Sequence, residues 1–442
     1  MKTFAWVSIA AAGLAVLGCN IDNKYTVGGT LTGLMGQGLV LEDNSGNSLS
    51  LASNGAFVFS GSIDNGGAYS VTVATQPSNP AQTCTVHNGS GTVDKTNVTN
   101  VIVSCTQAGR FAYVANQGSS DLSAYVINSS TGFLTPVAGS PFATSGTTPV
   151  SLIVDPNGEF LYVADNASND VSVYSIDSST GALTPAGVPV TTGSGPFALA
   201  VDPTDTYLYV ANFGANSVSA YTIDSSTGML TELSNSPFAV GSEPTSLKID
   251  PNGNFLYVTN YGDADVTVLA IDSSTGSLSA VAGSPFGAGT GALSITFDPA
   301  GTFAYVANET AASISEYSVN AATGGLTPVS GSPLATGSSP ESLAIDPAGQ
   351  FLYAANVTAK NDVAAYSITP STGALIVSGS AIGAGTFPIN IVLDPSGLFA
   401  YVANENSDDI SVYAVNTTTG ALTSAGSSPF AAGSQPRSIA ID

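Results

Sequence analysis

The chain has 442 residues, only 9% of them charged, and it is rich in glycine and other small residues. This composition suits short strands and tight turns better than surface helices, so we expect an all-β protein. The formal net charge of −24, from 31 acidic and 7 basic residues, excludes nucleic acid as a partner, because phosphate binding depends on Lys and Arg.

The first residues have the pattern of an export signal. Lys2 precedes an uncharged apolar run, Phe4 to Leu17, that is too short for a comfortable membrane span. The run ends in Leu17-Gly18-Cys19, which resembles the bacterial lipobox. The resemblance implies a signal peptide over residues 1–18 and a lipid on Cys19 as the sole membrane contact. Asn20 then favours the outer membrane, on its periplasmic or cell-surface face. An ordinary signal peptide is the alternative.

Residues 19–107 predict a small β-sandwich, Ig-like or transthyretin-like. Runs such as Ala56–Phe59 and Tyr69–Val73 alternate apolar and polar residues, and Asn-Gly pairs suit the turns between them. Cys84 and Cys105 form an even pair in an exported chain, so we predict a disulfide. Closing this loop would stabilise the fold by roughly 3 kcal/mol. Two free buried thiols are the alternative.

Residues 108–442 repeat one unit seven times. Its marker is a short apolar strand centred on a tyrosine, as in Phe111–Asn116. These tyrosines are spaced 47 to 49 residues apart, at Tyr113, Tyr162, Tyr209, Tyr257, Tyr305, Tyr353 and Tyr401. A period of this length indicates the blades of a β-propeller.

Each unit carries four strand signals separated by turn residues. In the second unit the strands are expected at Ser151–Val154, Phe160–Ala164, Val171–Ile176 and Ala182–Pro185. Asp155-Pro156-Asn157-Gly158 suits the first turn, and Gly181 can take a positive φ in the longer hairpin before the last strand. We therefore predict four-stranded antiparallel meanders without helices.

The two ends of the repeat array complement each other. The first unit begins at Arg110 without an inner strand, whereas the chain ends in Pro436–Asp442, which matches the inner strand of the other units. We predict that this last segment completes the first blade, so that seven blades form a closed ring.

The tyrosine-centred strands resemble the YVTN repeats of seven-bladed propellers in bacterial and archaeal surface proteins. These propellers fall within the wider lactonase-like group that includes 6-phosphogluconolactonase. The resemblance spans residues 108–442 and implies the fold strongly. It indicates function only weakly, because one fold hosts many functions.

Ligands of propellers commonly meet the axis at one rim. Aligning the units on their turn aspartate places one residue of each inner strand at this mouth: Val150, Phe197, Thr245, Leu293, Glu341, Ile389 and Arg437. We predict this mostly apolar ring as the binding surface. Lactonases of the family tend to carry His, Arg and Glu at such positions, but this propeller contains no histidine.

Glu341 and Arg437 do occupy family-like positions. If the protein is a lactonase, the resemblance implies that they act as base and electrostatic clamp. A salt bridge that seals the mouth is the alternative. Lys248, lower on an inner strand, is expected to contact nearby carbonyl groups.

No metal or cofactor is expected. The seven turn aspartates are explained as turn formers that accept hydrogen bonds from their own backbone. The upper loops are acidic, as at Asp263, Asp265, Glu405, Asp408 and Asp409, so a weak Ca²⁺ site or a partner-binding rim stays open as an alternative to solvated loops.

Our main hypothesis from the sequence is a monomeric, envelope-anchored lipoprotein that serves as a binding or scaffold module without catalysis. It rests on the lipobox, the missing histidines and the apolar mouth. Its ligand would be an unknown protein, carbohydrate or small molecule. The alternative is a lactonase that hydrolyses a sugar lactone at the mouth.

Overall fold

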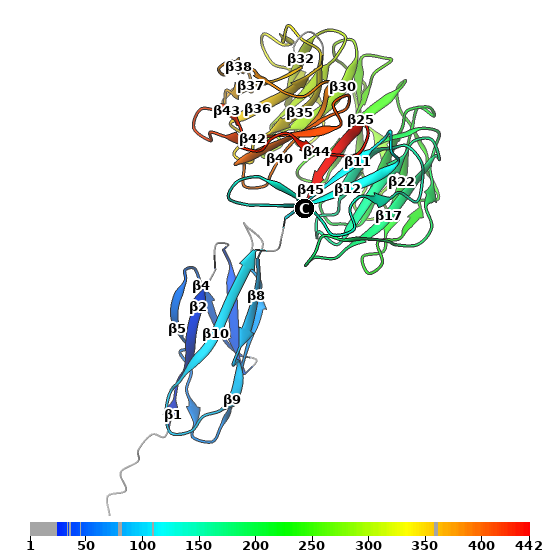
Figure 1. Ribbon diagram of the computed structural model, residues 1–442. Helices are drawn as coiled ribbons and strands as arrows, with labels where there is room; N and C mark the ends of the chain where they lie inside the picture. Colours follow the sequence, from blue (N-terminus) through cyan, green and yellow to red (C-terminus); the bar gives the residue numbers. More distant parts are fainter. Residues whose placement is uncertain are drawn as a thin grey trace, which may run out of the picture. The chain divides into compact units, whose positions relative to one another are not determined.

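The computed structural model describes residues 24–32, 34, 37–44, 46–77, 82–107, 110–357 and 361–442. The predicted signal peptide and Cys19 lie outside these residues. The chain divides at residue 108 into two compact units, each described by itself below (Figure 1). No helix in the described part of the chain is long and apolar enough to cross a membrane.

The first unit consists mainly of two four-stranded sheets. One has the order β5 (Gly55–Val58), β2 (Val27–Thr32), β10 (Val98–Gln107), β8 (Gln82–His87). The other has the order β4 (Asn47–Leu51), β3 (Leu39–Asp43), β7 (Ala68–Thr75), β9 (Ser90–Thr92), and β1 (Lys24–Tyr25) pairs separately with β6 (Ile63–Asp64). Only β2 and β10 run parallel among these pairs. The Ig-like or transthyretin-like topology stays a prediction.

Side chains from both four-stranded sheets form one apolar core. Leu39 and Leu41 of β3 are completely buried, as are Val101 and Val103 of β10. Their spacing of two residues follows from the alternation of side chains along a strand. Cys84 and Cys105 lie directly opposite each other on β8 and β10, and the predicted disulfide joins them within this core.

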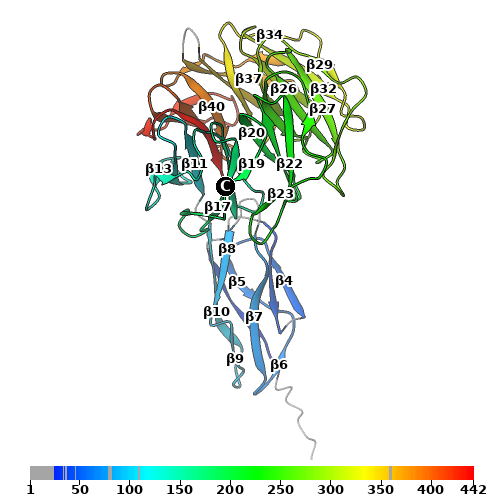
Figure 2. The same ribbon diagram turned by 90° about the vertical axis from the view of Figure 1, so that its right-hand side faces the viewer.

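The second unit contains seven sheets arranged around an axis (Figures 1 and 2). The prediction of an all-β, seven-bladed propeller is confirmed. The inner strands are β15 (Pro149–Val154), β20 (Pro196–Val201), β25 (Pro244–Ile249), β30 (Ala292–Phe297), β35 (Pro340–Ile345), β40 (Pro388–Leu393) and β45 (Pro436–Ile441). The second strands are β11 (Phe111–Asn116), β16 (Phe160–Asp165), β21 (Tyr207–Asn212), β26 (Phe255–Asn260), β31 (Phe303–Asn308), β36 (Phe351–Asn356) and β41 (Phe399–Asn404).

The outer half of each blade contains three further segments. The third strands are β12 (Asp121–Ile127), β17 (Asp170–Ile176), β22 (Ser217–Ile223), β27 (Asp265–Ile271), β32 (Ser313–Val319), β37 (Asp362–Ile368) and β42 (Asp409–Val415). The fourth are β13 (Leu134–Pro136), β18 (Leu183–Pro185), β23 (Leu230–Glu232), β28 (Leu278–Ala280), β33 (Leu326–Pro328), β38 (Leu375–Val377) and β43 (Leu422–Ser424). The last are β14 (Phe142–Ala143), β19 (Val190–Thr191), β24 (Phe238–Ala239), β29 (Phe286–Gly287), β34 (Leu334–Ala335), β39 (Ile382–Gly383) and β44 (Phe430–Ala431).

The outer edge of each blade differs from the predicted single strand. In the first blade both β13 and β14 pair with β12, and a Ser140-Pro141 segment separates them. Proline has no N–H to continue the ladder. The Ser140 hydroxyl instead accepts a hydrogen bond from the backbone N–H of Ala124 at 2.9 Å. Four other blades repeat this bond, so the interruption belongs to the repeat itself.

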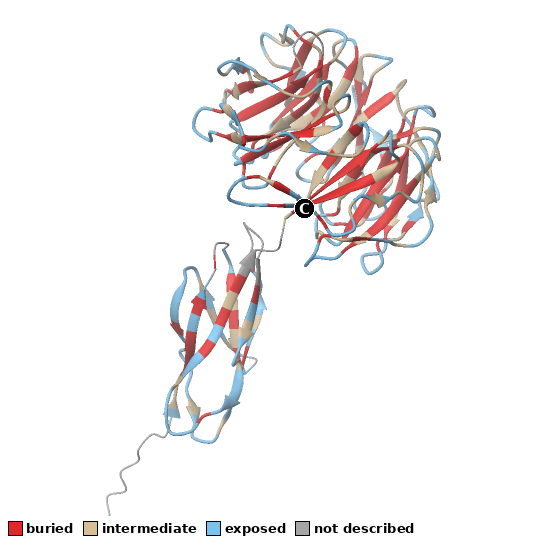
Figure 3. Ribbon diagram, in the orientation of Figure 1, coloured by how far each residue is buried: buried red, intermediate tan, exposed pale blue. Residues whose placement is uncertain are grey.

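Neighbouring blades pack through the repeated tyrosine. The second strands are buried along their whole length (Figure 3). The Tyr113 hydroxyl donates a hydrogen bond to the carbonyl of Gly181 in the next blade, at 3.1 Å. Four further blades make the same bond to the matching glycine. As predicted, Gly181 has a positive φ, 73°, and a Cβ there would overlap the Phe111 ring.

The first blade contains the last strand of the chain. β45 pairs antiparallel with β11, and Val114 lies opposite Ile439. The Asp442 carboxylate accepts a hydrogen bond from the N–H of Phe111 at 2.5 Å, as the turn aspartates of other blades do for their own second strand. The inner strands of all seven blades thus surround one axis.

Candidate functional site

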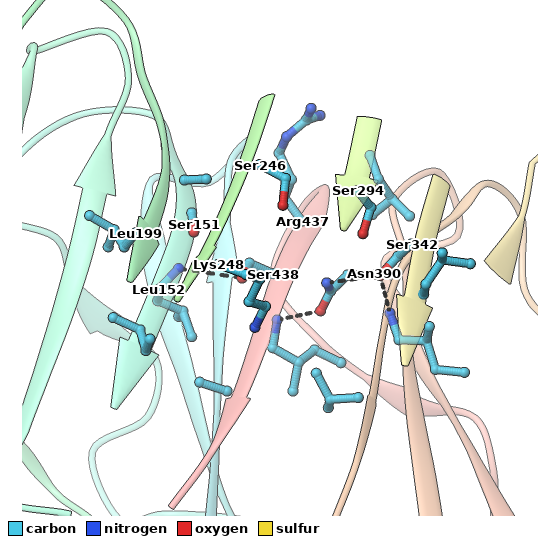
Figure 4. A pocket seen from close by; sticks show the side chains of 18 of the residues that line it. Ser151, Leu152, Leu199, Ser246, Lys248, Ser294, Ser342, Asn390, Arg437 and Ser438 are labelled. Atoms are coloured by element: carbon cyan, nitrogen blue, oxygen red, sulfur yellow. Dashed lines mark hydrogen bonds between the residues drawn. The ribbon is translucent and has the colours of Figure 1, made fainter. Parts of the chain in front are cut away.

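A cavity of about 390 Å³ occupies the axis, lined by all seven inner strands (Figure 4). The seven residues predicted at the mouth all line it: Val150, Phe197, Thr245, Leu293, Glu341, Ile389 and Arg437. The sequence alignment on the turn aspartates therefore brought together residues that share one cavity.

A bulge at the start of each inner strand explains this placement. In β35, Pro340 pairs with Asn356 and Ser342 with Ala355, so Glu341 between them has no partner on β36. The other six inner strands skip the matching residue in the same way, Arg437 included. A bulge turns a side chain away from the regular pleat, and here it does so at the rim of the cavity.

Not every mouth residue is free to contact a ligand. Val150 is buried, and so is Thr245, whose hydroxyl donates to the carbonyl of Ala292 at 3.1 Å. Phe197, Leu293 and Ile389 are half-buried and supply apolar surface at the rim.

Glu341 is the mouth carboxyl group whose pKa is shifted most clearly. Burial raises the pKa of its carboxyl group to about 7, and the negative charges of Glu309 and Glu405 add to the shift. The positive charge of Arg437 lowers the pKa of Glu341 and so opposes this shift. Near neutral pH the carboxyl group therefore exchanges its proton readily, which is the property of a general base or acid.

Arg437 is held as a cation at the rim. Its Nη1 lies 3.6 Å from Oε2 of Glu405, and its guanidinium carbon lies 5.1 Å from the centre of the Phe197 ring. Burial lowers the pKa of Arg437, while Glu405 and Glu341 oppose that change. The guanidinium group stays protonated in proteins, so it offers a fixed positive charge to a ligand. The ion pair joins Arg437 to Glu405, so the predicted alternative of a Glu341–Arg437 bridge is wrong.

A second cavity, of about 360 Å³, adjoins the first at the mouth and shares Leu293, Glu341, Ile389 and Arg437 with it. It adds Tyr261, Glu309, Phe387 and Glu405 to the site. The Tyr261 hydroxyl donates to Oε2 of Glu309 at 3.2 Å. The mouth is thus more acidic than the inner strands alone indicate.

The ring predicted from the inner strands did not include Glu309 or Glu405. Each directly follows the asparagine that ends a second strand, Asn308 or Asn404, and Tyr261 follows Asn260 in the same way. An alignment on that asparagine, in addition to the turn aspartate, was the signal that could have found them.

The turn aspartates and Lys248 differ in whether they have hydrogen-bond partners. The turn carboxylates accept backbone hydrogen bonds, as Asp250 does from Asn254 and Phe255, both at 2.7 Å. Lys248 makes no hydrogen bond or ion pair with any described residue, so its predicted contact with carbonyl groups is wrong. Within the described ranges, no group of three or more His, Cys, Asp or Glu is placed to hold a metal ion.

Seven blades around an axial cavity, with carboxylates and an arginine at its mouth, define a seven-bladed propeller of the lactonase-like class. The family model described as "Lactonase, 7-bladed beta-propeller" matches residues 75–197 and 190–436. The chain belongs to this family.

Solved structures with this fold include two proteins described as candidate 6-phosphogluconolactonases. The Bacteroides uniformis protein is 21% identical, with a TM-score of 0.67, over 76% of this chain and 100% of its own. The Bacteroides fragilis protein is 19% identical, with a TM-score of 0.67, over 76% and 99%. A periplasmic gluconolactonase of Pseudomonas aeruginosa is 21% identical, with a TM-score of 0.65, over 75% and 98%. No curated protein matches the chain.

These comparisons overturn the main hypothesis from the sequence, a scaffold without catalysis. The match to the lactonase family model favours the lactonase alternative. The scaffold hypothesis gave too much weight to the missing histidines. A half-buried carboxyl group with a pKa near 7 can take the proton that a histidine would otherwise take.

Proposed function

We propose that the propeller hydrolyses a sugar lactone at the mouth of its axial cavity. One observation carries the proposal: Glu341, with a pKa of about 7, and Arg437, a fixed cation, line the same cavity. Membership of the lactonase family supports it. The half-buried rings of Phe197 and Tyr261 offer apolar faces to a sugar.

In the proposed reaction the Glu341 carboxylate removes a proton from a water molecule, whose oxygen attacks the lactone carbonyl carbon. The Arg437 guanidinium stabilises the negative charge that develops on the carbonyl oxygen. The bond from that carbon to the ring oxygen then breaks, and Glu341 returns its proton to the departing oxygen. Lactone and water thus give one hydroxy acid, with no other reactant.

The experiment follows proton release from glucono-δ-lactone above the spontaneous rate, with purified protein that lacks residues 1–18. We expect kcat/KM to rise with pH through about 7, as Glu341 loses its proton. Glu341→Gln should lower kcat by about 10²–10⁴-fold, the usual contribution of a general base. Glu159→Gln, which changes an exposed glutamate at a turn of the second blade, should leave the rate unchanged. Equal rates for wild type and Glu341→Gln would contradict the proposal, as would no enzymatic rate with a panel of sugar lactones.

We also propose that the protein is exported and lipidated at Cys19. The support is the apolar run that ends in Leu17-Gly18-Cys19. Cys19→Ser should move the protein from the membrane fraction to the soluble envelope fraction in cell fractionation. Retention of the variant in membranes at the wild-type level would remove lipidation as the anchor.

A further inference from the structure

Lys248 is the only Lys or Arg among the described residues of the propeller that has no carboxylate partner. Arg110 lies 3.6 Å from Asp394, and Arg437 lies 3.6 Å from Glu405. Lys248 on β25 lines the axial cavity, and its side chain is exposed to that cavity. In Figure 4 its ammonium group and the Arg437 guanidinium group point toward opposite ends of the cavity.

The same cavity contains unused hydrogen-bond donors. One position of the inner strands carries Ser151, Ser246, Ser294, Ser342, Asn390 and Ser438, and Ala198 is the exception (Figure 4). The hydroxyls of Ser151, Ser246 and Ser294 make no hydrogen bond with any described residue. The Ser342 hydroxyl accepts a hydrogen bond from the backbone N–H of Ile391 at 3.2 Å. The Ser438 hydroxyl accepts one from the backbone N–H of Leu152 at 3.3 Å. Each can still donate its own hydrogen.

The charge balance of the cavity is unusual for this protein. The whole chain carries a formal net charge of −24, so its outer surface repels anions. Besides Lys248, the charged side chains on the cavity wall are Glu341 and Arg437 at the mouth. Burial lowers the pKa of Lys248, because the cavity wall solvates its charged form less well than water does.

We propose that the axial cavity binds one small anion, a halide or an oxyanion, on the Lys248 ammonium group and the free hydroxyls of neighbouring inner strands. The flexible four-carbon stem of lysine lets the ammonium group turn toward these hydroxyls. The anion can come from solution, or it can be the carboxylate that lactone hydrolysis releases. This second source alone rests on the proposed function.

The first test locates the anion with bromide. Crystals of the protein without residues 1–18 are soaked in sodium bromide. They should show an anomalous peak in the cavity, within contact distance of Lys248. Absence of a peak there would overturn the proposal.

The second test measures the melting temperature in solution at constant ionic strength. Chloride or phosphate at about ten times its Kd should raise Tm by about 2–4 °C. Lys248→Met should remove this increase, whereas Lys248→Arg should keep it. Lys24→Met removes an exposed charge from the first unit, and the increase should remain.

A third titration uses gluconate to separate the two sources. A larger rise in Tm with gluconate than with chloride or phosphate at the same concentration, lost in Lys248→Met, would identify the product carboxylate as the preferred anion. A rise with inorganic anions would identify a site for ions from solution, even if no lactone is hydrolysed. An equal rise in wild type and Lys248→Met would overturn the anion site.

Discussion

Asp165 stands where the other six blades carry an asparagine, at Asn116, Asn212, Asn260, Asn308, Asn356 and Asn404. In the last blade the Asn404 amide donates hydrogen bonds to Asp409 and Ser411, at 2.6 and 2.9 Å. Asp165 is fully buried and has no hydrogen to donate when ionised. Its Oδ2 accepts a hydrogen bond from the Ser172 hydroxyl at 2.6 Å. Its Oδ1 has no hydrogen-bond partner, but neither has the Oδ1 of five of the six asparagines, so the difference lies in the missing donor and the charge. One position of the repeat thus has lost its donor in the second blade.

We expect Asp165→Asn to stabilise the propeller. Burial raises the pKa of Asp165 to about 7, and the nearby Asp170 adds to the shift. In the unfolded chain this carboxyl group titrates near 3.9. The folded state therefore binds the proton more tightly between these values. The stability that this group contributes is fully present below about pH 4 and is lost as the pH rises through 7.

The measurement is urea unfolding of wild type and Asp165→Asn at pH 8 and pH 5. At pH 8 the variant should gain about 1–3 kcal/mol, because the asparagine amide restores a hydrogen-bond donor and removes a buried charge. At pH 5 the gain should be much smaller, because the wild-type carboxyl group is protonated. A gain of the same size at both pH values would show that the charge of Asp165 is not the cause.

At the scale of the element, the hairpin before each fourth strand links two neighbouring blades. Gly181 combines three constraints: a φ of 73°, the hydrogen bond that its carbonyl accepts from Tyr113, and the Phe111 ring packed where a Cβ would stand. Gly158, in the first turn of the same blade, has a φ of 72° but open space around it.

This pair separates backbone strain from packing between blades. Gly158→Ala should cost about 1 kcal/mol, the usual strain of a non-glycine residue in the left-handed region. Gly181→Ala adds overlap with Phe111, so it should cost about 1–3 kcal/mol more, as overpacking usually does. Thermal or urea unfolding of both variants measures the difference. Equal losses would mean that the Phe111 ring moves aside without cost.

Much of the blade could be predicted from the sequence because its signals are local. Turn residues such as Asp155-Pro156 and Gly181 force the chain to reverse, and apolar alternation locates the strands between them. The broken outer edge could not be predicted, because the Ser140 hydroxyl takes the place of a backbone carbonyl there. Glu309 and Glu405 lie in the loops that directly follow second strands, so the turn aspartates used to align the inner strands did not indicate them.

At the scale of the whole molecule, the ring depends on a contact between the two ends of the propeller. β45 supplies the inner strand of the first blade, with Ile439 buried and Ile441 packed against the same core. The seam between the last and first blades also has the tyrosine contact, from Tyr401 to the carbonyl of Gly132 at 3.1 Å. The C-terminal strand therefore supports a blade that begins more than 300 residues earlier in the chain, as the bond between Phe111 and Asp442 illustrates with its separation of 331 residues.

Deletion of residues 437–442 should destabilise the first blade before any other. The deletion exposes the inner side of β11 and removes two isoleucines. Ile439 is buried and worth about 1.5–3 kcal/mol, and the partly buried Ile441 is worth less. It also removes the carboxylate that binds the N–H of Phe111. Together these losses are a large share of the free energy of unfolding of a typical domain, which is roughly 5–15 kcal/mol. We expect a sharp fall in the Tm of the propeller.

Hydrogen exchange tells where the loss falls. Amide exchange should become fastest along β11, from Phe111 to Asn116, while β41 and the first unit, with its own core, keep their protection. Ile439→Ala offers a milder version, because it leaves the backbone pairing in place. It should cost about 2–5 kcal/mol, as for other buried isoleucines, with the same pattern of exchange. An unchanged melting curve, or faster exchange confined to β41, would show that β45 does not hold the ring closed.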